Sequence, residues 1–361
     1  MANLDVIVVG AGIIGSSIAL QLRRSGARVK IVDAAQPGGI ATRHSWAWIN
    51  ASSTSIGDYF RLRARSMEEW RVLETTLSAL RVSWTGSLNW SLPPDRMPDV
   101  VAEQSAWGYE TEMLDGKAIG RLEPHLSCYP DRAIRCPSEG AVDATAATAA
   151  MLQAFSELGG AIVPSCKVKT LAVSGRRVTG VITANGQFGA DMVIVAAGAA
   201  SPDLLMPIGL RVQVNAPPAL LVMFPVPSRV LNHLIITPEV EVRQDTAGRL
   251  IACVDVDTSA DEPATEKLLK LSASMREWFR LDDLPAPVHH VIAGRPIPAD
   301  GLPVIGMPDD IAGLYVAVTH SGVTLAPAIG RFVSDELLVG RRDRLLNGFG
   351  LNRFQSNAPT Q

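Results

Sequence analysis

The chain has 361 residues, of which 47% are hydrophobic and 19% charged, and its formal net charge is −3. This length and composition indicate a well-buried globular protein of two domains and exclude a disordered chain. The small net charge and the lack of long like-charge runs exclude a nucleic-acid-binding face and a polybasic membrane anchor. The four cysteines are scattered without CxxC spacing, so we expect neither a metal site nor a disulfide framework.

The opening of the chain predicts a strand, a helix and a second strand over residues 4–9, 13–25 and 27–33, which together form a βαβ unit. A loop rich in small residues and tryptophan follows, and then a long helix over 56–80. Farther along, the periodicity predicts helices over 143–158 and 325–339 and strands within 82–96, 161–197, 212–256 and 314–318. No stretch approaches the roughly 18 apolar residues of a membrane-spanning helix. We therefore expect a cytoplasmic protein, either free or peripheral to the inner membrane.

The turn between the first strand and the first helix has the sequence Gly10-Ala-Gly12-Ile-Ile-Gly15. In such a GxGxxG turn the first glycine bends the chain, the second lets the backbone approach a pyrophosphate, and the third packs the helix on the strand. The helix N-terminus then offers free N–H groups to the phosphates. Asp33 ends the second strand, where an acid binds ribose hydroxyls. The unit predicts an adenine-dinucleotide site.

Further motifs follow in a fixed order. They are Gly-Ala-Val-Asp at 140–143, a buried strand ending in small residues at 190–199, Ala-Gly-Arg-Pro at 293–296 with Asp-Gly-Leu-Pro-Val-Ile-Gly at 300–306, and His-Ser-Gly-Val-Thr-Leu-Ala-Pro at 320–327. With the glycine turn, these motifs resemble the D-amino-acid oxidase family of FAD-dependent oxidoreductases, especially its glycine oxidase and sarcosine oxidase branch. The likeness extends from residue 2 to about residue 354, and it implies that the cofactor is FAD.

The resemblance implies an α/β fold, in which a Rossmann-like FAD-binding domain is interleaved with a strand-rich α+β substrate domain. The FAD-binding domain is expected to comprise residues 1–84, 140–211 and 290–361. The substrate domain is expected to comprise residues 85–139 and 212–289. A flavin between two such domains has the substrate stacked on one face of its ring.

The family's motifs also assign the cofactor contacts. The residues expected to bind FAD are Gly10, Gly12, Ile13, Ile14, Gly15, Asp33, Ala34, Thr42, Arg43, His44, Ser45, Val168, Ala197, Gly198, Gly294, Arg295, Ser321, Gly322, Val323, Thr324 and Leu325. Among them, the segment 321–325 opens the last helix, so its backbone N–H groups can face the flavin C2=O.

The reaction implied is oxidation of a small amine or amino acid: a D-amino acid, glycine, sarcosine, or an N-alkyl or imino acid. A hydride passes from the α-carbon to flavin N5, and oxygen or a quinone then accepts the electrons. One alternative is a dehydrogenase that passes electrons to a quinone or a partner subunit. Another is a flavin-binding subunit of a hetero-oligomer. Nothing in the sequence indicates the oligomeric state.

Three residues are candidates for the chemistry. Arg295 stands at the family's carboxylate-clamping position, and an ordinary interdomain salt bridge is the alternative. His44 lies in a loop near the flavin and is a covalent attachment point, a polar contact or a structural residue. His320 is a polar contact near the ring or a structural histidine. Because Ile297 stands where the sarcosine oxidase branch has its flavin-linked cysteine, we expect non-covalent FAD.

Two other places bear on substrate recognition. Val242 and Arg243 stand where relatives often have a tyrosine that faces the substrate, so that interaction is not expected here. Trp46 and Trp48 either wall the active-site cavity or pack in the core.

Overall fold

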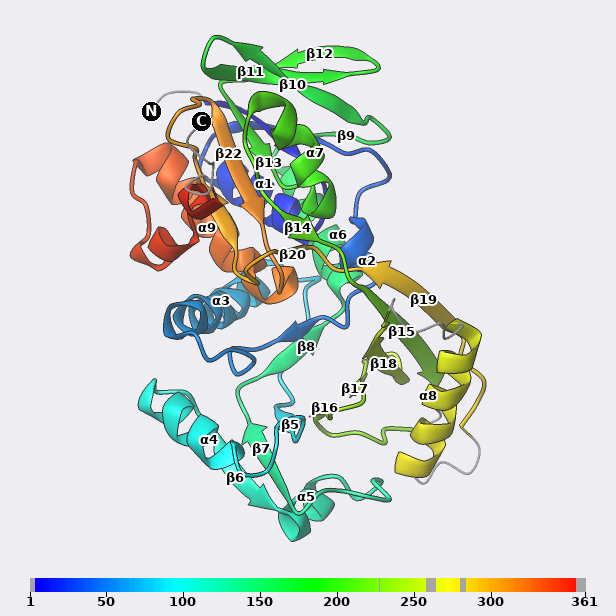
Figure 1. Ribbon diagram of the computed structural model, residues 1–361. Coiled ribbons are helices and arrows are strands. Elements are labelled where there is room, and N and C mark those ends of the chain that lie inside the picture. Colours follow the sequence, from blue (N-terminus) through cyan, green and yellow to red (C-terminus); the bar gives the residue numbers. More distant parts are fainter. Residues whose placement is uncertain (1–3, 227, 258–263, 280–283, 355–361) are drawn as a thin grey trace.

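The computed structural model describes residues 4–226, 228–257, 264–279 and 284–354. The parts of the predicted domains that fall on residues 1–3, 227, 258–263, 280–283 and 355–361 lie outside the described residues. In Figure 1 a mostly parallel sheet with its helices fills the upper half, and a large second sheet spans the lower half. The predicted α/β fold with a strand-rich second layer is confirmed.

The upper sheet has the order β21-β22-β13-β1-β2-β9. Its strands are β1 (Asp5–Val9), β2 (Arg28–Val32), β9 (Ala161–Val163), β13 (Met192–Val195), β21 (Val304–Gly306) and β22 (Leu314–Val318). All neighbours are parallel except the β21–β22 pair. Such strands are apolar on both faces because both faces are covered. Val6 and Val8 pack into one core, and Ile7 and Val9 pack into another.

Four long helices cover the first of these faces: α1 (Ile13–Arg24), α3 (Gly57–Thr76), α6 (Ala144–Glu157) and α9 (Gly322–Val339). The helix predicted over 143–158 is α6, and Asp143 caps it: the Asp143 carboxylate accepts a hydrogen bond from the Ala146 N–H at 2.9 Å. Helix α3 ends at Thr76, short of the predicted residue 80. The side chain of Glu74 accepts a hydrogen bond from the Val82 N–H at 2.8 Å, which stabilises a turned-back chain in place of a further helical turn.

The other face of the upper sheet is covered by a small antiparallel sheet and by α7 (Ser201–Leu205). That small sheet contains β10 (Val168–Ser174), β11 (Arg177–Thr183) and β12 (Gly186–Gly189). Two further small sheets connect the halves of the molecule. They are β3-β8-β4 and β14-β20, with strands β3 (Trp48–Ile49), β4 (Val82–Ser83), β8 (Gly140–Val142), β14 (Val214–Asn215) and β20 (Ile297–Pro298).

The lower sheet has the order β19-β15-β18-β17-β16-β5-β7-β6. Its strands are β5 (Ser87–Asn89), β6 (Glu112–Asp115), β7 (Arg132–Cys136), β15 (Pro218–Pro225), β16 (Leu234–Ile236), β17 (Glu241–Gln244), β18 (Arg249–Asp255) and β19 (His289–Gly294). One face packs against α8 (Ala264–Trp278). The opposite face packs against Trp46 and Trp48 and looks toward the upper half. The division into two domains remains a hypothesis. Its expected FAD-binding domain includes residues 290–361, yet β19 pairs with β15 as the edge strand of the lower sheet.

The remaining helices are short: α2 (Ile40–Arg43), α4 (Met97–Ala106) and α5 (Gly116–Leu122), with 3-10 turns at 198–200, 206–208, 344–349 and 351–354. Among the described residues, no helix is both long and apolar enough to cross a membrane.

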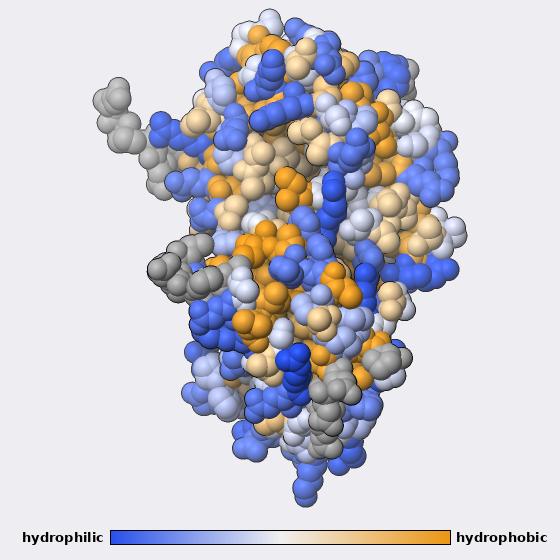
Figure 2. Space-filling model, turned by 90° about the vertical axis from the view of Figure 1, so that its right-hand side faces the viewer, coloured by the Kyte–Doolittle hydropathy of each residue, from blue (hydrophilic) through white to orange (hydrophobic). Residues whose placement is uncertain are grey.

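The face in Figure 2 carries a group of apolar side chains at mid-height. Elements α2, α8 and β19 lie on this side in Figure 1, and they expose Ile40, Leu269 and Ile292.

Candidate active site

A cavity of about 1060 Å³ lies between the glycine turn and the inner face of the lower sheet. Its first end is formed by the turn at Gly10 and Gly12, by Asp33 and by α2. Its second end is formed by strands of the lower sheet and by the segment that leads into α9. Small-molecule pockets commonly measure about 300–1,000 Å³, so this cavity is large enough for an extended ligand together with a small one.

The glycine turn is built as the motif requires. Gly10 has φ +107°, a conformation that side chains rarely adopt, and a Cβ there would lie 2.5 Å from the Ala196 carbonyl oxygen. A Cβ on Gly15 would meet the Gly10 carbonyl oxygen, so the third glycine lets α1 pack on β1. A Cβ on Gly12 would make only ordinary contacts, 3.4 Å from Thr42 Oγ1 and 3.7 Å from Gly39 Cα. The fold therefore leaves the space beside Gly12 to a ligand.

The carboxylate of Asp33 holds this turn in place. Its Oδ2 accepts a hydrogen bond from the Ala11 N–H at 2.6 Å, and its Oδ1 accepts one from the Ala35 N–H at 2.8 Å. Each carboxylate oxygen has a further acceptor site, which is available to a hydroxyl in the cavity. The hydroxyl of Thr42 accepts a hydrogen bond from the Ile13 N–H at 3.1 Å and so caps the start of α1.

The start of α9 is held by side chains from α3. Pro327 lies inside α9 and has no N–H to offer the Val323 carbonyl. The indole of Trp70 donates to that carbonyl instead, at 2.9 Å. The hydroxyl of Thr324 donates to the Trp48 carbonyl oxygen at 2.9 Å. These bonds fix the segment before α9, where Ser321 has φ 55°.

Arg63 brings a buried positive charge to this segment. Its guanidinium donates to Ser321 Oγ at 2.7 Å and to Asn50 Oδ1 at 2.6 Å, and in the described part of the chain it pairs with no carboxylate. Ser321 Oγ in turn lies 3.3 Å from His320 Nδ1. Burial first, and then the charges of Arg63 and Arg295, lower the pKa of His320 to about 4 against the opposing effect of Asp255. His320 is therefore a neutral imidazole at physiological pH.

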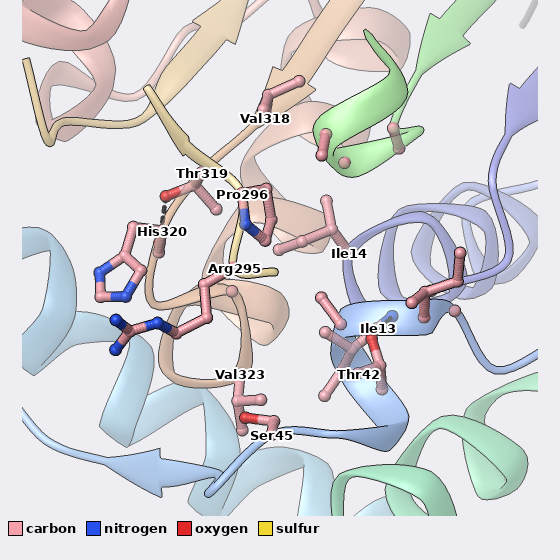
Figure 3. A pocket seen from close by; sticks show the side chains of 18 of the residues that line it. Ile13, Ile14, Thr42, Ser45, Arg295, Pro296, Val318, Thr319, His320 and Val323 are labelled. Atoms are coloured by element: carbon pink, nitrogen blue, oxygen red, sulfur yellow. Dashed lines mark hydrogen bonds between the residues drawn. The ribbon is translucent and has the colours of Figure 1, made fainter. Parts of the chain in front are cut away.

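Arg295 follows β19 and lies beside His320. Figure 3 shows the two side chains next to each other, across the view from Ile13 and Thr42. Arg295 Nη2 is 2.6 Å from Asp255 Oδ1, while no described residue accepts a hydrogen bond from the buried Nε. The Asp255 side chain is 76% exposed, so this ion pair contributes little stability and can open for an anionic ligand.

The strand β17 contributes to the cavity a carboxylate, that of Glu241, which was not predicted from the sequence. Glu241 lines the cavity, whereas Val242 is buried in the core on the other face of the sheet. Arg243 is also buried, and its guanidinium donates to the Trp46 carbonyl oxygen at 2.6 Å. Burial is the main cause that raises the pKa of Glu241 to about 7, with a smaller opposing effect of the Arg295 charge and a smaller supporting effect of Asp255. The residue of β17 that faces the cavity is therefore Glu241, one position before the expected pair.

Comparison with known proteins identifies the family. The family model for DAO, the FAD dependent oxidoreductases, matches residues 5–336. The chain belongs to this family of FAD-dependent oxidoreductases. It is 24% identical to a glycine oxidase of Pseudomonas aeruginosa, over 93% of this chain and 95% of that protein. It is 25% identical to a D-amino acid dehydrogenase of Rhizobium johnstonii, over 93% and 96% of the two chains. The fold matches the crystal structure of an L-proline dehydrogenase from P. horikoshii with a TM-score of 0.89 at 20% identity, over 98% of both chains.

The cofactor of this oxidoreductase is FAD, and the cavity fits it. The glycine turn, Asp33 and the α1 N-terminus suit the pyrophosphate and ribose. Two residues that line the cavity each have a buried side-chain nitrogen without a hydrogen-bond partner among the described residues: Nδ1 of His44 and Nε of Arg295. Buried polar atoms are nearly always paired, so the described residues alone leave the hydrogen bonding of this cavity wall incomplete.

The residues predicted from the sequence gather around this one cavity of the oxidoreductase, apart from Gly15 and Leu325. Gly15 packs against the Gly10 carbonyl oxygen on the side of α1, and Leu325 is fully buried in α9. Trp46 and Trp48 line the cavity and also pack against the lower sheet. The pKa of His44 is lowered by burial and by the nearby His289 and Arg43. The roles of these residues toward FAD and substrate remain proposals.

Sequence reasoning missed Arg63 and Glu241 in this oxidoreductase. Arg63 carried a readable signal, because it falls on the buried stripe of α3 with Phe60, Met67 and Trp70. A charged side chain is rarely buried on an apolar helix face unless it has a specific polar partner. Glu241 carried a weaker signal, since only the pairing of β17 with β18 determines which of its residues face the cavity.

Proposed function

We propose that this oxidoreductase oxidises the carbon–nitrogen bond of a small α-amino or α-imino acid and releases the imine. The observation that carries the proposal is the guanidinium of Arg295. It lies at the second end of the cavity, which we take as the substrate end, and its Nε has no hydrogen-bond partner among the described residues. A planar guanidinium binds a carboxylate through two parallel hydrogen bonds. The similar proteins support this choice, because glycine, D-amino acids and L-proline all carry a carboxylate next to the amine carbon.

Bound FAD supplies the acceptor for the hydride that leaves the α-carbon. Arg295 binds the substrate carboxylate and thereby fixes the orientation of the α-carbon. As it does so, the exposed Asp255 is displaced or shares the guanidinium. His320 contributes a neutral imidazole beside the clamp, so it neither repels an ammonium group nor competes with Arg295 for the carboxylate.

The segment Ser321–Leu325 contributes electrostatic stabilisation. The N-terminus of α9 and the uncompensated charge of Arg63 both place positive potential at this end of the cavity. Negative charge that develops on a ligand there is stabilised most strongly when such groups are fixed in advance. The hydrogen bonds of Trp70 and Arg63 fix this segment.

Anaerobic reduction of the flavin tests the proposal. A screen of D- and L-amino acids, glycine, sarcosine and imino acids should find substrates that bleach the visible absorption of bound FAD. For such a substrate, Arg295→Ala and Arg295→Lys should lower the reduction efficiency by about 30-fold or more, because losing a buried charge-assisted clamp costs roughly 2–5 kcal/mol. FAD content should stay near that of the wild type.

The matched control is Arg249→Lys, which alters an arginine of β18 that is paired with Asp245 at 2.7 Å and lies outside the cavity lining. Arg295 variants within about threefold of the wild type, or a screen that yields only amines without a carboxylate, would contradict the proposal. The named relatives include an oxidase and dehydrogenases, so oxygen and a quinone are both candidate electron acceptors. Reoxidation timed with air against a quinone dye separates them.

A further inference from the structure

We propose that Glu241 is the group that binds the substrate amine and takes a proton from it before oxidation. This inference rests on the proposed function, since it concerns the same cavity and the same class of substrate. It adds a catalytic residue on β17 of the lower sheet, and the carboxylate of this residue is opposite in charge to the guanidinium of Arg295.

The sheet register brings Glu241 to the clamp. Glu241 pairs with Cys253 across β17 and β18, and both side chains line the cavity. On the same face, Asp255 lies two residues beyond Cys253 and holds Arg295. The Arg295 charge acts on Glu241 through this arrangement. A bound amino acid whose carboxylate is held by Arg295 therefore has an anionic group within reach of its other functional group.

The carboxylate of Glu241 is half-buried, and no described residue donates a hydrogen bond to it. A desolvated carboxylate without donors is unfavourable unless a ligand supplies a cation or a donor. The charges of Arg295 and Asp255 act on Glu241, and Cys253 pairs with it across the two strands. Arg63, His44 and His320 are further titratable groups that line the same cavity. In the proposed function, Arg295 binds the substrate carboxylate. The cation that pairs with Glu241 is then the ammonium group of the same substrate.

The chemistry requires that the substrate ammonium lose a proton before oxidation. An ammonium nitrogen has no lone pair, whereas the lone pair of a neutral amine forms the C=N bond as the hydride leaves. In the transfer, an N–H bond of the ammonium breaks and an O–H bond forms on Glu241, with no change in oxidation state. The pKa of Glu241, raised by burial to about 7, suits an acceptor that works near neutral pH.

Neighbouring groups fit this role less well. Burial and nearby charges lower the pKa of His320 to about 4, which makes it a weak proton acceptor. Burial first, and the charge of Glu241 second, raise the pKa of Cys253 to about 12, so its thiol stays protonated. Asp255 is paired with Arg295 and largely exposed.

The test uses Glu241→Gln, which keeps the shape of the side chain and removes its charge. The ligands are matched pairs that share a carboxylate and differ at the amine: glycine and glycolate, alanine and lactate, proline and tetrahydrofuran-2-carboxylate. The variant should reduce its flavin about 30-fold or more slowly with the best amine at pH 7, and the inflection near pH 7 in reduction efficiency should disappear. It should bind the amine-free partner roughly tenfold more tightly at pH 8, because the repulsion between two carboxylates is gone.

Titrations of the holoenzyme with the amine-free acids give a readout apart from turnover, through the change in flavin absorption. In the wild type this binding should weaken as pH rises through about 7, as Glu241 ionises; in the variant this weakening should be absent. Glu241→Asp keeps the charge and should retain the weakening. The control Glu239→Gln makes the same chemical change at an exposed position outside the cavity and should behave as the wild type.

The outcomes separate the two proposals. If Glu241→Gln reduces its flavin within about threefold of the wild type, with an unchanged pH profile and unchanged binding of the amine-free acids, Glu241 has no such role and the proposed function stands. If no amino or imino acid reduces the wild-type flavin, the proposed function fails and this inference fails with it.

Discussion

The two ends of the cavity are built in different ways. At the proposed cofactor end, beside the glycine turn, Gly10, Gly12 and Asp33 lie within 24 residues of one another in sequence. The two glycines act through the backbone, and Asp33 holds the backbone of the turn through its carboxylate. At the substrate end, Glu241, Arg295 and His320 come from distant segments and act through charged or titratable side chains. The first end is formed by one short segment, and the fold leaves no room for a Cβ at Gly10 or Gly15. The second end depends on strand register, so we expect its side chains to be replaceable without a change of fold.

This difference predicts how each end responds to substitution. Changes at the cofactor end should remove FAD or the fold itself. Changes at the substrate end should leave both in place and alter the rate, the pH dependence or the choice of ligand. The largest effects are therefore expected in the glycine turn.

Gly12→Ala should give a folded protein that has lost FAD. Its φ of −73° suits alanine, and the new Cβ would make only ordinary contacts with Thr42 and Gly39. That Cβ would nevertheless stand where the backbone must approach the pyrophosphate. We expect less than about a tenth of the wild-type FAD content, measured by absorbance, with the unfolding temperature of the ligand-free protein unchanged.

Gly15→Ala is the matched comparison within the same turn. Its Cβ would overlap the Gly10 carbonyl oxygen, and overpacking of this kind typically costs about 1–3 kcal/mol. This variant should lower the unfolding temperature of the ligand-free protein as well as its FAD content. A Gly12→Ala protein that binds FAD stoichiometrically would contradict the placement of the pyrophosphate.

The cofactor end could be predicted from the sequence because its residues lie close together in the chain. A βαβ unit, its glycines and Asp33 are determined over some thirty residues, and the βαβ pattern leaves little choice of geometry. Arg295 and His320 were found through motifs that resemble a family, and the structure places both at one cavity. Their partners were not predictable, because the Arg295–Asp255 pair and the cavity-facing position of Glu241 depend on how β17, β18 and β19 are ordered.

Asp33→Asn should weaken FAD binding by an intermediate amount. The amide has one acceptor oxygen and no charge, so it cannot both keep the bonds from Ala11 and Ala35 and offer a charged acceptor to a ribose hydroxyl of FAD. Loss of a hydrogen bond to a charged group costs about 1.5–3 kcal/mol, so the dissociation constant of FAD should rise by roughly 10- to 100-fold. Fluorescence titration of the ligand-free protein with FAD measures it.

Asp5→Asn makes the same change in the exposed ion pair between Asp5 and Arg28, whose side chains are 47% and 50% exposed. A solvent-exposed ion pair contributes little stability, and this one lies outside the cavity lining. Its FAD affinity should equal that of the wild type. Equal effects of Asp33→Asn and Asp5→Asn would show that Asp33 is not part of the cofactor site.

The smallest effect concerns the stability of the substrate end. The pKa of Glu241 rises from 4.5 to about 7 on folding, mainly through burial, so the folded state holds more protons than the unfolded state between these pH values. Stability therefore falls as pH rises through this window, and the loss is complete above about pH 7. Glu241→Gln removes the loss, so the ligand-free variant should match the wild type near pH 4.5 and exceed it at pH 8 by on the order of 1–2 kcal/mol, after allowance for partial solvent access. Thermal unfolding at both pH values measures this, with Glu239→Gln as the control. A difference between wild type and Glu241→Gln that does not change with pH would mean that the Glu241 carboxylate ionises in the folded protein as readily as in water.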